Sequence, residues 1–178
     1  MDFSLTDDQQ AIIESVQKIC DDFGDDYWLT LDNEGEFPYE FHASMAEGGW
    51  LGITMPEEFG GAGLGVTEAA LMMHKVANSS GAMAAASSIH INIFGPHPIV
   101  VFGTHEQKKR WLPPLIKGEQ KCCFGITEPD AGLNTTSITT RALRDGDNYK
   151  VSGKKVWTST ALQADKIMLL TRTTPKEE

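Results

Sequence analysis

The most informative stretch of this 178-residue chain is Phe124-Gly125-Ile126-Thr127-Glu128-Pro129-Asp130-Ala131-Gly132-Leu133-Asn134-Thr135-Thr136. Its first residues are typical of a β-strand, and Pro129 ends that run in a turn. The turn leads into small and hydroxyl-bearing residues, whose N–H and O–H groups can face an anion or a polar ring edge. An ordinary connection between two strands has a similar composition, so the residue pattern alone leaves both interpretations open.

A second stretch, Val156-Trp157-Thr158-Ser159-Thr160, places an aromatic residue beside three hydroxyls. The pattern predicts that it lies at the end of a strand formed by residues 154–158. Further strands are expected at 122–127, 138–143 and 166–173, with turns at 144–147 and 152–153. Trp157 either stacks on a planar cofactor or belongs to the core.

The residues before 121 read as helices. Thr6 and Gln9 form a capping box for a helix that ends near Gly24. Further helices are expected at 39–47, from a cap at Thr67 to 78, at 82–94, at 99–102, and at 105–112, where Pro113 and Pro114 break the run. We therefore expect a helical domain over residues 1–120 and a β domain over 121–178. Because so few strands cannot complete a barrel or sandwich, we expect the chain to be a piece of a longer protein.

Composition excludes several classes of protein. The formal charge of −10 gives no electrostatic support for nucleic-acid binding. No apolar run reaches the roughly 20 residues of a membrane span, and the acidic N-terminus does not resemble a signal peptide, so a cytoplasmic protein is expected. The three cysteines are interpreted as core residues, and the five histidines show no metal-ligand spacing. Gly60, Gly61, Gly63 and Gly65 do not fit a phosphate-binding loop and are interpreted as a surface turn.

Five ordered motifs resemble the acyl-CoA dehydrogenase family. Residues 124–135 are similar to its flavin-binding signature and residues 156–160 to its second flavin segment. The other similar stretches are 51–61, 102–118 and 153–157. The resemblance implies an α+β multidomain fold, in which an all-α N-terminal domain precedes a truncated, β-barrel or sandwich-like middle domain. A C-terminal four-helix bundle would follow, and this chain would hold about half of the middle domain and none of the bundle.

The resemblance also implies FAD as the cofactor. The residues carried over to the flavin are Phe124, Ile126, Thr127, Gly132, Leu133, Trp157, Thr158 and Ser159. Thr127 would bond the pyrimidine edge, Trp157 would cover the ring, and Ser159 would reach N5. Leu133, which would also face the CoA substrate, replaces a common serine of the family, and Phe124 replaces a commoner tyrosine. The catalytic base is expected beyond residue 178, while Glu128 is interpreted as a turn or ion-pair residue.

The implied activity is FAD-dependent α,β-dehydrogenation of an acyl-CoA thioester to a trans-2-enoyl-CoA, in fatty-acid or related catabolism. The implied partners are an electron-transferring flavoprotein and further copies of the chain in a tetramer. The 178-residue chain alone is expected to be inactive. Two alternatives stay open: an acyl-CoA oxidase or another flavin enzyme of the same fold, and a non-catalytic fragment that binds flavin or CoA.

Overall fold

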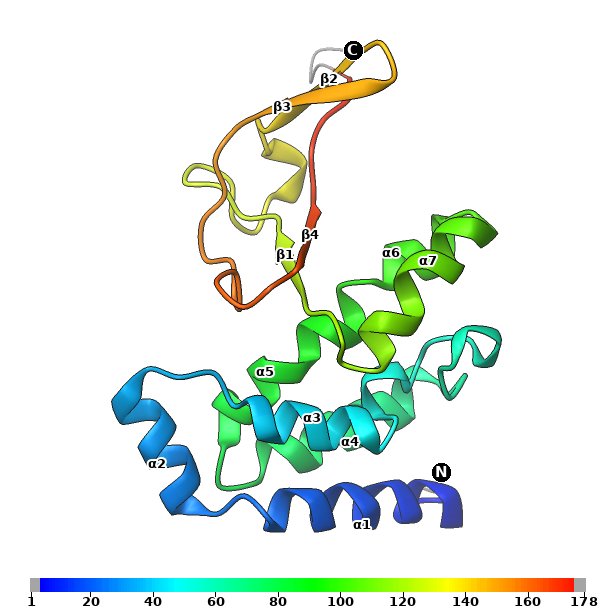
Figure 1. Ribbon diagram of the computed structural model, residues 1–178, viewed down its shortest axis with the longest axis vertical. Helices are drawn as coiled ribbons and strands as arrows, with labels where there is room; N and C mark the ends of the chain where they lie inside the picture. Colours follow the sequence, from blue (N-terminus) through cyan, green and yellow to red (C-terminus); the bar gives the residue numbers. More distant parts are fainter. Residues whose placement is uncertain (1–3, 175–178) are drawn as a thin grey trace. The chain divides into compact units, whose positions relative to one another are not determined.

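The computed structural model describes residues 4–174 and divides the chain into two compact units (Figure 1). The first unit extends to Lys121, and the second begins at Cys122. Within the described residues, no helix is long and apolar enough to cross a membrane.

The first unit consists of helices. The α-helices are α1 (Asp7–Asp21), α2 (Asp25–Glu34), α3 (Tyr39–Glu47), α4 (Val66–Ala77), α5 (Ala82–Phe94), α6 (His97–Phe102) and α7 (His105–Ile116), and two 3-10 turns, η1 (Trp50–Gly52) and η2 (Glu57–Phe59), lie between α3 and α4. Helix α1 packs along α4, and α4 packs along α5. Their apolar faces bury a continuous core that includes Val16, Phe41, Met72 and Ile89. Burial of this apolar surface is the main force that holds the helices together.

Several predicted helix boundaries are confirmed. The capping box of Thr6 and Gln9 begins α1, and a second box of Thr104 and Gln107 begins α7. Helix α4 differs from its prediction, because Gly65 rather than Thr67 precedes it. The carboxylate of Glu68 accepts a hydrogen bond from the Gly65 N–H and supplies the cap. The glycine-rich segment before α4 is a turn that packs on the residues around Met55, as expected of a structural glycine cluster.

Helix α7 contradicts the predicted break, because it continues through Pro113 and Pro114 to Ile116. Each proline removes one backbone donor from the helix, which ordinarily costs about 3 kcal/mol. The loss is offset by Leu112 and Ile116, whose side chains are buried against Met55 and Phe59. Tertiary packing therefore overrides the local preference of the sequence.

The second unit contains two small sheets. Strands β1 (Cys122–Gly125) and β4 (Lys166–Leu169) pair in parallel, and β2 (Arg141–Asp145) and β3 (Asn148–Ser152) form an antiparallel hairpin. The hairpin turns at Gly146, whose φ of +62° suits a glycine in a two-residue connection. A short 3-10 turn, η3 (Thr135–Ser137), precedes β2. The backbone N–H of Ala142 donates to Arg172 O and that of Arg172 to Thr140 O, which fastens the hairpin to the segment after β4.

The strand predicted over residues 154–158 is absent from the described part of the chain. Residues 154–160 form an irregular loop in which Trp157 and Thr160 have φ of +59° and +57°. A left-handed residue cannot continue a β-ladder, so the side chains of Thr158 and Ser159 do not alternate between two faces as they would on a strand. The strand predicted from residue 138 begins instead at Arg141, and the strand predicted from 166 ends at Leu169.

Candidate functional site

The predicted flavin residues lie on two segments of the second unit. The first segment is residues 124–136, and the second is residues 155–160. Phe124 belongs to β1, where it pairs with Met168 of β4, and Ile126 and Thr127 follow directly. Trp157, Thr158 and Ser159 lie in the loop after β3. The N–H of Val156 donates a hydrogen bond of 2.9 Å to the carbonyl oxygen of Thr127. This hydrogen bond holds the residue before Trp157 against Thr127 of the first segment.

The ring of Trp157 faces solvent. Its side chain is 88% exposed, so Trp157 does not belong to the core of the described residues. Large aromatic side chains are normally buried, and non-glycine residues rarely adopt positive φ. The two features together make Trp157 a candidate ligand contact. Beside it, Thr158 is half-buried and Ser159 is exposed.

The turn after Thr127 presents backbone donors. It is closed by two hydrogen bonds between Glu128 and Ala131, and the next two residues, Gly132 and Leu133, are exposed. Within residues 4–174, the N–H groups of Gly132 and Leu133 have no acceptor, and a β-carbon at Gly132 would meet no atom within 4 Å. The leucine side chain is fully exposed. Free amides in an open turn can bind an anion such as a pyrophosphate.

These features fit a flavin dinucleotide. A planar ring system is matched by the exposed indole of Trp157, a polar ring edge by the hydroxyls of Thr127 and Ser159, and a pyrophosphate by the free amides of Gly132 and Leu133. In the part of the chain that the structure describes, Val156 and Lys155 supply the hydrogen bonds between the two loops. Across residues 4–174, no backbone hydrogen bond joins Gly132 or Leu133 to Trp157 or Ser159.

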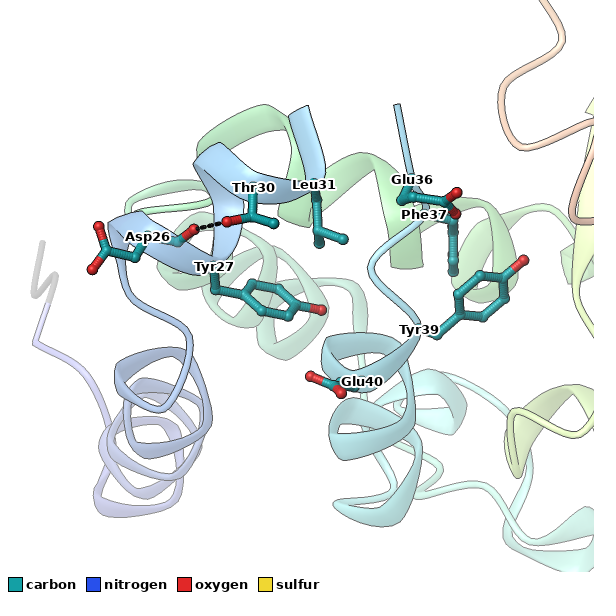
Figure 2. Close-up of a pocket in the computed structure, with 8 residues that line it drawn as sticks. All are labelled: Asp26, Tyr27, Thr30, Leu31, Glu36, Phe37, Tyr39 and Glu40. Carbon is teal, nitrogen blue, oxygen red and sulfur yellow. Dashed lines mark hydrogen bonds between the residues drawn. The ribbon is translucent and has the colours of Figure 1, made fainter. Parts of the chain in front are cut away.

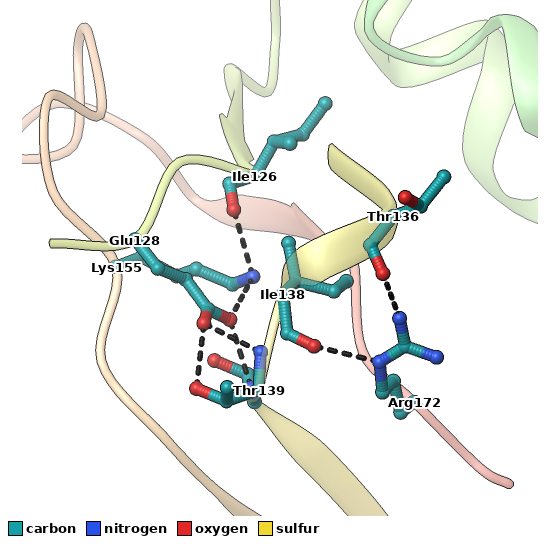
Figure 3. Close-up of polar contacts among 8 residues, drawn as sticks. Ile126, Glu128, Thr136, Ile138, Thr139, Lys155 and Arg172 are labelled. Atoms are coloured by element: carbon teal, nitrogen blue, oxygen red, sulfur yellow. Dashed lines mark hydrogen bonds and ion pairs between the residues drawn. The ribbon is translucent and has the colours of Figure 1, made fainter. Parts of the chain in front are cut away.

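A buried ion pair joins the two segments, and the sequence did not identify its members as a pair. Nζ of Lys155 is 2.9 Å from Oε1 of Glu128, and it also donates to the carbonyl oxygen of Ile126 at 2.8 Å (Figure 3). The two side chains are only 9% and 4% exposed. The interpretation of Glu128 as an ion-pair residue is confirmed. Its partner is 27 residues away in the sequence, and no local pattern connects the two.

The carboxylate of Glu128 has further donors on its other side. The N–H and Oγ1 of Thr139 donate to Oε2 at 2.6 and 2.7 Å, and the N–H of Thr140 donates to Oε1 at 2.8 Å. Burial by itself raises the pKa of Glu128, but the hydrogen bonds from Thr140, Thr139 and Lys155 outweigh it and hold the pKa well below its usual range. Glu128 is therefore ionised at neutral pH and has its oxygens fully engaged.

Arg172 binds the backbone further along the chain, at Thr136 and Ile138. Its Nε donates to the carbonyl oxygen of Ile138 at 2.6 Å, and its Nη2 donates to the carbonyl oxygen of Thr136 (Figure 3). A guanidinium presents several donors in a fixed plane, which suits the bracing of two neighbouring carbonyl groups. Arg172, which follows β4, thus fixes the backbone at the hydroxyl-rich end of the first segment.

A pocket of about 550 Å³ lies in the first unit, between α2 and the start of α3 (Figure 2). Its wall includes three aromatic rings and three carboxylates, from Tyr27, Phe37, Tyr39, Asp26, Glu36 and Glu40. None of the predicted flavin residues lines it. The ammonium of Lys121 lies 5.9 and 5.3 Å from the centroids of the Phe37 and Tyr39 rings, so this edge of the pocket already holds a cation from the chain itself.

Family comparisons cover almost the whole chain. Residues 6–119 match the model described as acyl-CoA dehydrogenase, N-terminal domain, and residues 123–178 match the one described as acyl-CoA dehydrogenase, middle domain. The chain is 36% identical over 174 residues to acyl-CoA dehydrogenase FadE12 of Mycobacterium tuberculosis, covering 96% of this chain and 43% of the relative. It is 34% identical over 179 residues to acryloyl-CoA reductase (NADH) of Anaerotignum propionicum, covering 99% and 45%. It therefore spans less than half the length of these relatives.

Solved structures agree with this similarity. A chain in a structure of the electron transferring flavoprotein of Acidaminococcus fermentans superposes with a TM-score of 0.88 and 31% identity, covering 98% of this chain and 46% of that chain. The FAD complex of PigA superposes with a TM-score of 0.91 and 27% identity, with the same coverage. Both the helical unit and the β unit are therefore shared with flavin-associated proteins of similar fold.

Proposed function

Because the chain belongs to the acyl-CoA dehydrogenase family, we propose that its second unit carries the FAD-binding turn of an oxidoreductase acting on the α,β bond of an acyl-CoA thioester. The observation that carries the proposal is the hydrogen bond from Val156 to Thr127, which joins the two predicted flavin segments beside the exposed ring of Trp157. The solved FAD complex of a protein with this fold supports the choice of cofactor.

Each segment has its own task in this proposal. Trp157 covers the isoalloxazine ring, Thr127 and Ser159 offer hydroxyls to its polar edge, and Phe124 and Ile126 supply apolar contact. Gly132 and Leu133 offer backbone N–H groups to the pyrophosphate, and Leu133 also lies toward the CoA side. FAD supplies hydride transfer, chemistry that no protein side chain provides. The residues of this chain bind and orient the reactants, which is the part of catalysis that position and preformed hydrogen bonds deliver.

Glu128 does not act as the catalytic base. Its oxygens accept hydrogen bonds from Thr139, Thr140 and Lys155, and its side chain is buried. A base must reach the proton that it removes, and its pKa should lie near the working pH. Glu128 meets neither condition, because its pKa is held low by these same donors. We assign the base to a residue outside the described part of the chain, and we expect the 178-residue chain alone to bind FAD without turnover.

A second candidate function is the reverse reaction, the reduction of a 2-enoyl-CoA. The acryloyl-CoA reductase (NADH) of Anaerotignum propionicum is similar over 99% of this chain. Reduction of a 2-enoyl-CoA uses the same flavin and the same carbon atoms in the reverse sense. For the dehydrogenase direction we propose an electron-transferring flavoprotein as the electron acceptor and a homotetramer in the cytoplasm as the working assembly.

The test begins with FAD titration of the purified chain, followed by flavin absorbance after gel filtration. Retained FAD is the expected result, and absence of retention by both the chain and the complete gene product would contradict the proposal. The complete gene product is then assayed in both directions, with butyryl-CoA, octanoyl-CoA or isovaleryl-CoA and a dye, and with acryloyl-CoA and NADH. Rapid reoxidation of its reduced flavin by air would instead indicate an acyl-CoA oxidase.

A further inference from the structure

We propose that Lys155 and Glu128 are positioning residues, which hold the two predicted flavin segments in fixed register before the cofactor binds. This inference rests on the proposed function for its consequence, because the segments are those assigned to FAD. Its structural basis is independent of FAD, since every contact involved lies within the second unit of the chain.

Lys155 joins the two segments directly. Its ammonium donates to the carbonyl oxygen of Ile126 on the first segment and to the carboxylate of Glu128 two residues later. Its neighbour Val156 donates its backbone N–H to Thr127, which lies between them. Three consecutive residues of the first segment are therefore held by two consecutive residues of the second. Trp157 follows at once, so its backbone begins from a fixed point.

Glu128 anchors this junction to the β-hairpin. Its carboxylate accepts from the backbone N–H groups of Thr139 and Thr140, the two residues that lead into β2. Gly153, just after β3, lies so close to Thr140 that a β-carbon there would be 2.2 Å from Oγ1 of the threonine. The pair therefore fixes both predicted flavin segments relative to the hairpin.

Stability alone does not account for a buried pair of this kind. Removing two charges from water can cost more than their attraction returns, and apolar replacements of both partners are often tolerated. An ammonium offers three donors from one atom, which allows Lys155 to bind a carbonyl and a carboxylate at the same time. A methionine in its place can fill the space but cannot bind either group. The contact with Ile126 is thus the feature that only the charged residue supplies.

The experiment separates positioning from stability. It compares the wild-type chain, Lys155→Met, the double variant Glu128→Gln with Lys155→Met, and Lys154→Met as the control at an exposed neighbouring lysine. The first readout is hydrogen exchange of the Val156 N–H, with the Leu170 N–H, which donates to Gly125 at 3.0 Å, as an internal reference. The second is urea unfolding, and the third is the dissociation constant for FAD.

We expect Lys155→Met to speed exchange at Val156 about tenfold and to weaken FAD binding by a similar factor, as loss of a hydrogen bond to a charged group predicts. The exchange rate of the Leu170 N–H should be unchanged in Lys155→Met. Lys154→Met should leave the exchange rate of Val156 and the FAD affinity unchanged. In the double variant, the resistance to urea should recover in part, because no unpaired charge remains but the amide of Glu128→Gln keeps one acceptor oxygen for the N–H groups of Thr139 and Thr140. Val156 exchange and FAD affinity should stay impaired.

Recovery of Val156 protection and FAD affinity together with stability in the double variant would overturn the proposal and leave the pair a structural role only. Unchanged FAD affinity in Lys155→Met, despite faster exchange, would overturn it as well. If the wild-type chain and the complete gene product bind no FAD but Val156 responds as expected, the positioning of the segments is supported and the proposed flavin function fails.

Discussion

The side-chain amide nitrogen of Asn92 lies 3.1 Å from Nε2 of His42 in the buried interior of the helical unit. An amide nitrogen donates, so Nε2 accepts and the neutral ring carries its proton on Nδ1. Burial first, and then the positive charge of Lys121, lower the pKa of His42 to about 4. The imidazole is only 2% exposed, so the charged form is strongly disfavoured in the folded state.

Stability of the helical unit should therefore fall as the pH is lowered from about 6.5 to about 4. In that window the unfolded chain binds a proton at His42 while the folded chain does not, which favours unfolding. Full loss of this contribution amounts to about 3 kcal/mol, from a pKa difference of roughly 2.5. Urea unfolding followed by helical circular dichroism at pH 7 and pH 5 measures the effect.

The matched variants for this prediction are His42→Gln and His74→Gln. His42→Gln should flatten the dependence between pH 7 and pH 5, whereas His74→Gln, at an exposed position of α4, should keep the wild-type slope. An equal slope in the wild type and His42→Gln would show that the buried imidazole does not govern acid sensitivity.

Gly61 lies against the backbone of Met55. A β-carbon at Gly61 would be 2.1 Å from the carbonyl oxygen of Met55, which cannot move without shifting the turn. Gly61→Ala should lower the free energy of unfolding by about 1–3 kcal/mol, as overpacking does. Gly132→Ala, where a β-carbon meets nothing within 4 Å in an exposed turn, should change it by less than about 0.5 kcal/mol. Chemical denaturation of both variants measures the two free energies of unfolding, and equal values would contradict the prediction.

Ser159 should affect flavin binding more than Thr158 does. Ser159 is exposed beside Trp157, while Thr158 is half-buried. Loss of a neutral hydrogen bond costs about 0.5–1.5 kcal/mol, so Ser159→Ala should weaken FAD binding about two- to tenfold. Thr158→Ala should leave FAD affinity nearly unchanged. Fluorescence titration of both variants measures this, and a larger effect at Thr158 would mean that the loop presents the opposite side to the cofactor.

Local signals predicted much of the helical unit. The capping boxes at Thr6 and Thr104 mark the starts of α1 and α7, and paired glycines mark the end of α3. Helix α2 was not predicted, because it is short and polar and buries only Trp28. The continuation of α7 beyond Pro113 was also missed, since it depends on burial against residues more than fifty positions earlier.

The motifs of the candidate site were visible in the sequence, but their support was not. Trp157 and Glu128 were both singled out, yet the left-handed backbone of one and the partner of the other follow from tertiary structure. Lys155 stands next to another lysine, and nothing in the spacing distinguishes the buried residue from the exposed one. The roles of the flavin residues remain predictions.

The most direct test of the account is FAD titration of the wild-type chain and of Trp157→Ala, with Tyr149→Ala as the control at another exposed aromatic residue. Stacking on a flavin contributes about 0.5–1.5 kcal/mol beyond burial, so Trp157→Ala should bind FAD about two- to tenfold more weakly. The visible spectrum of flavin bound to Trp157→Ala should shift, while the urea midpoint of this variant stays unchanged. Tyr149→Ala should keep the wild-type FAD affinity and spectrum. Equal FAD affinity and an identical spectrum in wild type and Trp157→Ala would contradict the claim that this loop covers the flavin.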